Sequence, residues 1–164
     1  MSNEEANGRT PGRNPDLERL NRLIGEWELE VSLDGQTYRG GHVTFEWLED
    51  GAFLVQRSEV SDLSTLPPGW VENAPRSTVS IIGLDDTSEQ FWMLYADSRD
   101  VFRVYKMSLS DEVWGLRRDA PEFSQRFTSN FDDDANVIEG TWEYSDDGVD
   151  WEVDFDVTYT RTGA

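Results

Sequence analysis

From residue 26 onward, apolar and polar side chains alternate along most of the chain. The segment 26–33, EWELEVSL, places Trp, Leu or Val at every second position, with Glu or Ser between them. A period of two is typical of strands that bury one face. Further runs of this kind predict strands through 43–47, 52–60, 77–84, 90–96, 101–109, 113–118, 123–131, 137–144 and 151–161.

Most of the predicted strands are separated by short segments that carry turn residues. Asp34-Gly35 and Asp50-Gly51 are two such turns, and Asp146-Asp147-Gly148 is a third. Sequential strands with tight turns favour an up-and-down barrel, in which closure removes exposed strand edges. The pattern therefore predicts an all-β fold, an antiparallel up-and-down β-barrel of about ten strands.

A short helix is predicted in front of the first strand. Asn14 can cap it, Pro15 suits its first position, and Leu17, Leu20 and Leu23 recur at helical spacing. Residues 1–14 are polar and lack periodicity, which predicts a disordered tail. Residues 15–164 then form one domain, a length that fits a single core.

One connection, Ser61–Arg76, is longer than the others and rich in proline. Trp70 lies near its middle. Long loops in compact barrels often cover binding sites, so Trp70 is a candidate lid residue. The alternative is that Trp70 plugs one end of the barrel as part of the core.

The chain is strongly acidic. It has 34 Asp and Glu against 14 Lys and Arg, a net charge of −20, and no cysteine. Such a field repels nucleic acid and anionic lipid, so neither is expected as a partner. The composition suits a salt-adapted protein, since salt screens the repulsion among carboxylates. Without an apolar segment of membrane-spanning or signal-peptide type, we expect a cytoplasmic protein.

The segment Gly25-Glu26-Trp27, just after the predicted helix, resembles the Gly-x-Trp of the calycin (lipocalin-like) superfamily. In that superfamily the Trp closes one end of the barrel, and a basic residue of the last strand packs across it. The resemblance therefore pairs Trp27 with Arg161. The segments 97–109, 120–127 and 154–161 are similar to an uncharacterised bacterial and archaeal lipocalin-like family, which implies the fold and no activity.

Nitrobindin-like haem barrels are distant relatives in the same superfamily. Their pattern has a longer glycine-rich run after the Trp and a haem-ligating histidine late in the chain. Here Glu28 and Glu30 stand in place of the glycines, and His42 is the only histidine. Its strand parity places it toward solvent. We therefore predict no haem, no other cofactor and no metal site.

Strand parity also indicates which polar groups point into the barrel. If the most apolar face of each strand is inward, a few polar side chains lie among aromatic ones. An interior arginine suits a carboxylate or a similar anion. These groups could equally satisfy one another within a filled core. The candidate ligand-binding residues are Arg57, Tyr95, Arg103, Tyr105, Arg118 and Gln125.

The sequence favours a barrel that binds a small apolar or amphipathic ligand, which could carry an anionic end. Two alternatives stay open. One is an isomerase or cyclase that uses Tyr105 and Arg103 for proton handling. The other is a barrel filled by side chains that serves as a protein-interaction module, and a homodimer is also open. The absence of a nucleophile motif or a multi-histidine set disfavours catalysis.

Overall fold

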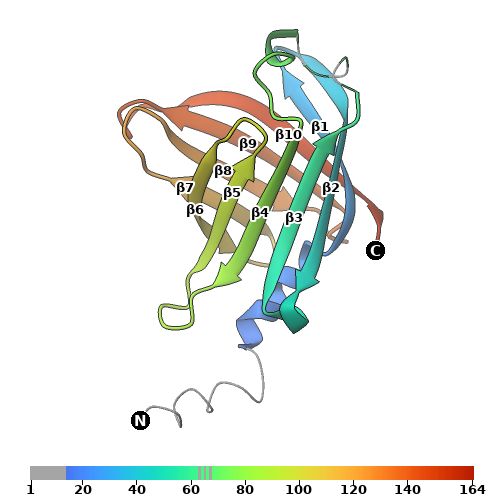
Figure 1. Cartoon of the computed structure of the whole chain (residues 1–164), viewed down its shortest axis with the longest axis vertical. Coiled ribbons are helices and arrows are strands. Elements are labelled where there is room, and N and C mark those ends of the chain that lie inside the picture. The colour runs from blue at the N-terminus through green and yellow to red at the C-terminus, as the bar shows by residue number, and fades with distance from the viewer. Residues whose placement is uncertain (1–13, 63, 65, 67) are drawn as a thin grey trace.

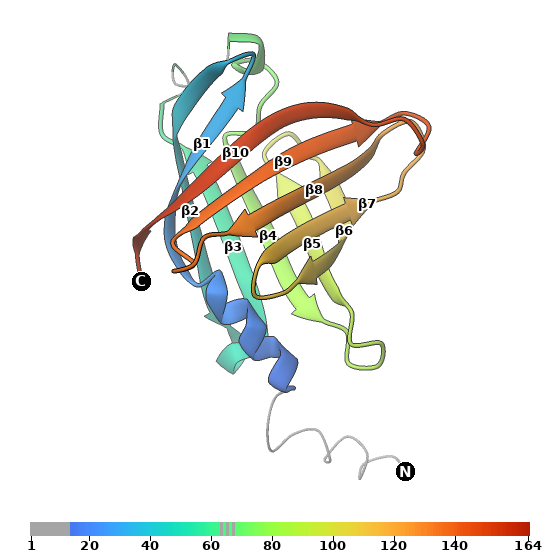
Figure 2. The same cartoon turned by 180° about the vertical axis from the view of Figure 1, so that it is seen from behind.

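The ten strands found in the described residues close into one antiparallel barrel (Figure 1; Figure 2). The computed structural model describes residues 14–62, 64, 66 and 68–164. Each strand pairs with its neighbours in sequence, and β1 pairs with β10 to complete the closure. The predicted fold class is therefore confirmed. The strands are β1 (Gly25–Leu33), β2 (Gln36–Leu48), β3 (Phe53–Val60), β4 (Ser77–Leu84), β5 (Phe91–Asp97), β6 (Phe102–Leu109), β7 (Val113–Arg118), β8 (Ser124–Phe131), β9 (Val137–Ser145) and β10 (Glu152–Gly163).

A 3-10 helix, η1 (Pro15–Arg22), lies across one end of the barrel (Figure 1). The Asn14 side chain accepts a hydrogen bond from the Asp16 backbone N–H at 2.9 Å, which caps the helix. The predicted helix start is therefore confirmed. Apart from Asn14, the predicted tail 1–14 lies outside the described residues. None of the helices in the described part of the chain is long and apolar enough to cross a membrane.

The β3–β4 connection lies at the opposite end of the barrel from η1 (Figure 1). It contains the short 3-10 helix η4 (Pro68–Trp70), while the β2–β3 connection contains η2 (Glu49–Gly51). We call the described residues of the segment 61–76 the Trp70 loop; residues 63, 65 and 67 lie outside the described residues. η1 and the Trp70 loop lie at opposite ends of the barrel, so a helix covers one end and a loop covers the other.

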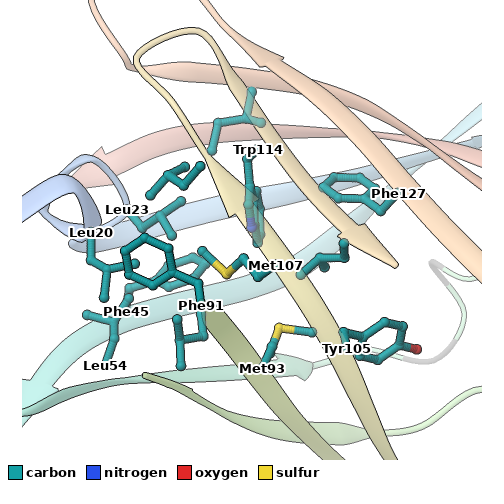
Figure 3. Close-up of a cluster of buried hydrophobic side chains, with 14 of the residues drawn as sticks. Leu20, Leu23, Phe45, Leu54, Phe91, Met93, Tyr105, Met107, Trp114 and Phe127 are labelled. Atoms are coloured by element: carbon teal, nitrogen blue, oxygen red, sulfur yellow. The ribbon is translucent and has the colours of Figure 1, made fainter. Parts of the chain in front are cut away.

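The hydrophobic core fills the end of the barrel beside η1. Leu20 and Leu23 are fully buried and point from the helix toward Phe45 and Phe91 (Figure 3). Inward positions of the strands complete this core, because alternate residues of a strand face the same side. The further buried core residues include Trp27, Val43, Leu54, Ile82, Met107, Leu109, Trp114 and Ile138.

Gly140 of β9 allows one large aromatic ring to lie flat inside the barrel. A Cβ atom at this position would lie 2.5 Å from Cε1 of Phe127. The missing side chain therefore makes room for Phe127, which is 1% exposed and packs edge-on against Trp114. A glycine inside a strand often marks a close approach of this kind.

Candidate functional site

The end of the barrel beside the Trp70 loop holds a cavity of about 430 Å³. This volume lies in the range of small-molecule sites. Strands from β1 to β10 and the Trp70 loop contribute to its wall. Its apolar and aromatic lining residues include Leu29, Val31, Met93, Trp114, Leu116, Phe123, Phe127, Trp142, Phe155 and Val157.

Gln125 of β8 is the centre of a polar group in the cavity wall. Its Oε1 accepts a hydrogen bond from the Tyr105 hydroxyl at 2.7 Å and from Nη1 of Arg103 at 3.3 Å. The Arg103 guanidinium also lies over the Phe123 ring, 5.1 Å from its centroid. These contacts therefore hold the side chains of Arg103, Tyr105 and Gln125, from strands β6 and β8, in a fixed orientation.

A second polar group joins β5 to the Trp70 loop. The Asp97 carboxylate, which is fully buried, accepts a hydrogen bond from the Tyr95 hydroxyl at 2.7 Å and from Nη2 of Arg99 at 2.6 Å. Burial raises the pKa of Asp97, but the hydrogen bonds from Arg99 and Tyr95 outweigh it and lower the pKa to about 2. Arg99 also donates to the Asn73 carbonyl at 3.0 Å, which ties the loop to this carboxylate.

Two of the tyrosines that line the cavity, Tyr95 and Tyr105, keep their protons. Burial raises the pKa of Tyr95, and the hydrogen bond to Asp97 raises it further. Burial also raises the pKa of Tyr105, although the charges of Arg103, Arg118 and Arg99 act in the opposite direction. At neutral pH both hydroxyls are therefore hydrogen-bond donors, and neither is a phenolate base.

Four of the six candidate residues line the cavity, namely Tyr95, Arg103, Tyr105 and Gln125. Arg118 is not part of the lining. It lies on β7 with its Cα opposite that of Gln125, on the same face as Trp114 and Leu116. Its Nε is buried and has no hydrogen-bond partner among the described residues.

Arg57 lies on the outer surface, which corrects the predicted parity of β3. Its side chain is exposed and pairs with Glu46. The inward residues of β3 are Leu54, Gln56 and Ser58, because their Cα partners on β2 include the buried Val43 and Phe45. Phe53, Leu54 and Val55 are all apolar, so alternation alone does not distinguish the two faces.

The last strand contains a second departure from simple alternation. The register of β10 against β9 shifts between Val153 and Phe155. Val153, which simple alternation would place on the same face as Phe155 and Val157, is 61% exposed, whereas Asp154 lines the cavity beside Phe155. A bulge re-aims a side chain in this way. Burial raises the pKa of Asp154.

Sequence reasoning missed Gln56, Arg99 and Asp154 as lining residues. Gln56 was missed because the inward face of β3 is the opposite of the predicted one. Asp154 was missed because of the bulge in β10. Arg99 lies in the β5–β6 turn, where no periodicity indicates a direction. Only the pairing of Arg99 with the buried Asp97 brings it to the cavity.

Trp70 and the pair Trp27–Arg161 occupy the two ends of the barrel. The Trp70 ring lines the cavity and meets the Phe155 ring edge-on, with centroids 4.9 Å apart. At the η1 end, the Arg161 guanidinium lies 4.1 Å from the centroid of the Trp27 ring. Arg161 also donates to the backbone carbonyls of Arg22 and Ile24, so it joins the last strand to the helix segment.

In the ranges that the structure describes, no three His, Cys, Asp or Glu side chains are grouped to hold a metal ion. His42 is exposed. The arrangement is thus a mostly apolar cavity with hydrogen-bonding groups gathered around Gln125 and Asp97. Such a site can bind and orient a small amphipathic molecule.

Comparison with known proteins gives a similarity of fold. No protein-family model matches the chain, and no curated protein matches its sequence. The crystal structure of Rv2717c from M. tuberculosis is similar, with a TM-score of 0.54 and 12% sequence identity. The match covers 91% of this chain and 98% of that chain. The barrel therefore has a structural neighbour of nearly the same extent, while membership of the calycin superfamily stays a prediction.

Proposed function

We propose that this protein binds a small apolar or amphipathic molecule in the cavity beside the Trp70 loop. The observation that carries the proposal is the cavity itself, about 430 Å³ with an aromatic wall and a few fixed polar groups. Removal of apolar ligand surface from water at such a wall is favourable. The polar groups around Gln125 and Asp97 would then set the orientation of the ligand.

Two features distinguish this proposal from the alternatives. A filled-barrel interaction module needs a lumen packed along its whole length, and here the core leaves a cavity of about 430 Å³ at the end beside the Trp70 loop. An isomerase or cyclase that uses Tyr105 as a base needs a phenolate, and burial raises the pKa of Tyr105. The cavity therefore favours binding over both alternatives.

The first experiment measures binding of an uncharged fluorescent probe, N-phenyl-1-naphthylamine, to the full chain. We expect saturable fluorescence enhancement with one site per chain. Ser58→Trp should abolish it, because Ser58 lines the cavity and an indole would occupy that space. Thr128→Trp, on the exposed outer face of β8, is the matched control and should bind as the wild type does.

Native mass spectrometry of protein purified without added ligand tests the same proposal independently. We expect a co-purified small molecule in the wild type and in Thr128→Trp, and none in Ser58→Trp. A wild-type protein that neither carries a molecule nor binds the probe would contradict the proposal. Equal probe binding by Ser58→Trp and wild type would also contradict it.

A further inference from the structure

The cavity wall carries a set of unpaired cationic and amide donors that points to a particular ligand chemistry. We propose that Arg103, with Gln125 beside it and Arg118 behind it, binds the carboxylate or sulfonate group of an amphipathic anion. The apolar part of the ligand would lie against the aromatic wall. This inference rests on the proposed function and names the chemical class of the ligand.

The first argument is the distribution of ion pairs. Most of the described arginines pair with a carboxylate, as expected for a chain with 34 acidic residues. Arg103 and Arg118 form no ion pair with a described residue, although both are partly buried. Partial burial of an arginine without a counter-charge costs hydration energy, and a bound anion would offset that cost. The arginines that do pair are Arg19, Arg22, Arg39, Arg57, Arg99, Arg117 and Arg126.

The second argument is the orientation of Gln125. Arg103 can only donate, so the Gln125 atom facing it must be the amide oxygen. The Gln125 NH₂ group is then directed elsewhere, although the side chain is only 8% exposed and lines the cavity. Arg103 likewise uses one N–H for Gln125 and keeps its other donors for a ligand. The site thus offers two sets of unused donors on one side of the cavity.

The third argument is the balance of charge around the site. The wall contains Arg76, Arg99 and Arg103 as cations, of which Arg99 is already paired with Asp97, and Glu59 and Asp154 as acids. Glu59 is exposed, and Asp154 lies on β10, two strands away from Gln125. Neither acid forms an ion pair with Arg103 or Arg118 within the described chain. Arg103 and Arg118 therefore place positive charge without a carboxylate partner at and behind the cavity wall of a protein whose net charge is −20.

A matched pair of fluorescent probes tests the inference. 1-Anilinonaphthalene-8-sulfonate carries a sulfonate on the ring system of N-phenyl-1-naphthylamine, which is uncharged. We expect the wild type to bind the sulfonate at least tenfold more tightly, because a charge-assisted hydrogen bond contributes more than a neutral one. Arg103→Gln should weaken sulfonate binding by about tenfold and change binding of the uncharged probe by less than about twofold.

Arg57→Gln is the control, because it removes the same charge from the outer surface of the barrel. It should leave both affinities unchanged. If Arg103→Gln fails to fold, Arg118→Gln should show the same selective loss with a smaller size. Equal wild-type affinity for the two probes, or equal loss of both in the variants, overturns the anion site and leaves the cavity proposal intact. No binding of either probe by the wild type overturns both proposals.

A different observation concerns the outside of the barrel. Six large apolar side chains are exposed together on β4, β5 and β6, and we call them the β4–β6 face. Cross-strand pairing makes them contiguous, since Ile81 pairs with Leu94 and Leu94 with Val104. The members of the face are Val79, Ile81, Trp92, Leu94, Phe102 and Val104, with exposures between 37% and 63%.

The β4–β6 face also lacks acidic residues. Within β4, β5 and β6 the residues that share its cross-strand rows are Gly83, Ala96 and Lys106, so this part of the rows contains no carboxylate. Two copies of a protein with a net charge of −20 repel each other, and the repulsion is weakest where carboxylates are absent. Contiguous exposed apolar surface is typical of interaction sites. We infer that the β4–β6 face is the interface of a homodimer.

Sedimentation velocity of the full chain in dilute buffer and in molar KCl tests the interface. We expect a dimer, with tighter association in KCl because salt screens the remaining repulsion. Leu94→Glu should convert the dimer to a monomer. Val149→Glu adds the same charge at an exposed position in the β9–β10 turn and should remain dimeric. A monomeric wild type in both buffers, or a dimeric Leu94→Glu, overturns the inference.

Discussion

The two ends of this barrel are built from the same alternating strands and differ in what fills them. At the η1 end, Leu20 and Leu23 enter the lumen from the helix and complete a packed core. At the other end, residues of the Trp70 loop, including Leu66, Trp70 and Pro75, line a cavity of about 430 Å³ and do not fill it. The comparison teaches that alternation builds the wall, while the element at each end decides whether the lumen is filled.

The same contrast appears in two arginines that each lie over an aromatic ring. Arg161, over Trp27, donates to the backbone carbonyls of Arg22 and Ala135 at 2.7 and 3.0 Å and to further acceptors. Arg103, over Phe123, has Gln125 as its one acceptor in the described chain. A guanidinium that uses most of its N–H donors within the chain stabilises the fold. A guanidinium with several unused N–H groups, such as that of Arg103, is available to bind a ligand.

The largest effect is expected at the packed end. Trp27 is fully buried, and its Nε1 donates to the Leu23 carbonyl at 2.9 Å. Trp27→Ala should lower the free energy of unfolding by about 3–5 kcal/mol, through lost burial and the cavity left behind. Urea denaturation measures this change. A loss below about 1 kcal/mol would show that packing at the η1 end contributes little to the stability of the fold.

A smaller effect, with a defined pH dependence, is expected where the Trp70 loop is attached. The pKa of Asp97 is about 2 in the folded protein, below its ordinary value. Its hydrogen bonds therefore stabilise the fold above about pH 4, and this contribution is lost as the pH falls toward 2.

Asp97→Asn tests this directly. It should lower the free energy of unfolding by about 1 kcal/mol at pH 7, less than the pKa shift alone implies, because Arg99 is partly exposed. The difference between variant and wild type should shrink between pH 4 and pH 2. A difference that stays constant over that range would assign the effect to packing instead of charge.

The smallest effect on stability is expected at Trp70. Its ring contacts Phe155 over the cavity and is only partly buried, so Trp70→Ala should cost about 1 kcal/mol or less. The Trp70→Ala substitution should instead affect ligand binding. N-phenyl-1-naphthylamine should dissociate from the variant about twofold to tenfold faster than from the wild type, as measured by stopped flow. A stability loss as large as that of Trp27→Ala would make Trp70 a plug of the core, and the two ends would then be alike.

Much of the architecture could be predicted from the sequence because it depends on local chemistry. The turn residues Asp34-Gly35 separate β1 from β2, and the Asn14 cap precedes η1. The inward direction of Tyr105 and Gln125 also follows from the period of their strands. In each case, residues that are close together in the sequence are sufficient to predict the feature.

The site could be predicted only in part, because some of its residues depend on cross-strand register. Arg57 was predicted to face inward and is exposed, since the run Phe53–Val55 conceals which face of β3 is buried. Asp154 lines the cavity because β10 contains a bulge, which the alternation of apolar and polar residues in this strand does not predict. A shift of one residue reverses every side chain that follows it.

By itself the sequence determined that this chain forms an antiparallel barrel with a helix at its start and a long loop at Ser61–Arg76. Only the tertiary structure decided that one half of the lumen is packed and the other is open. The reason is physical: periodicity records which side of a strand faces inward. The space left inside depends on how side chains from distant strands, such as Phe45 of β2 and Trp114 of β7, meet across the barrel.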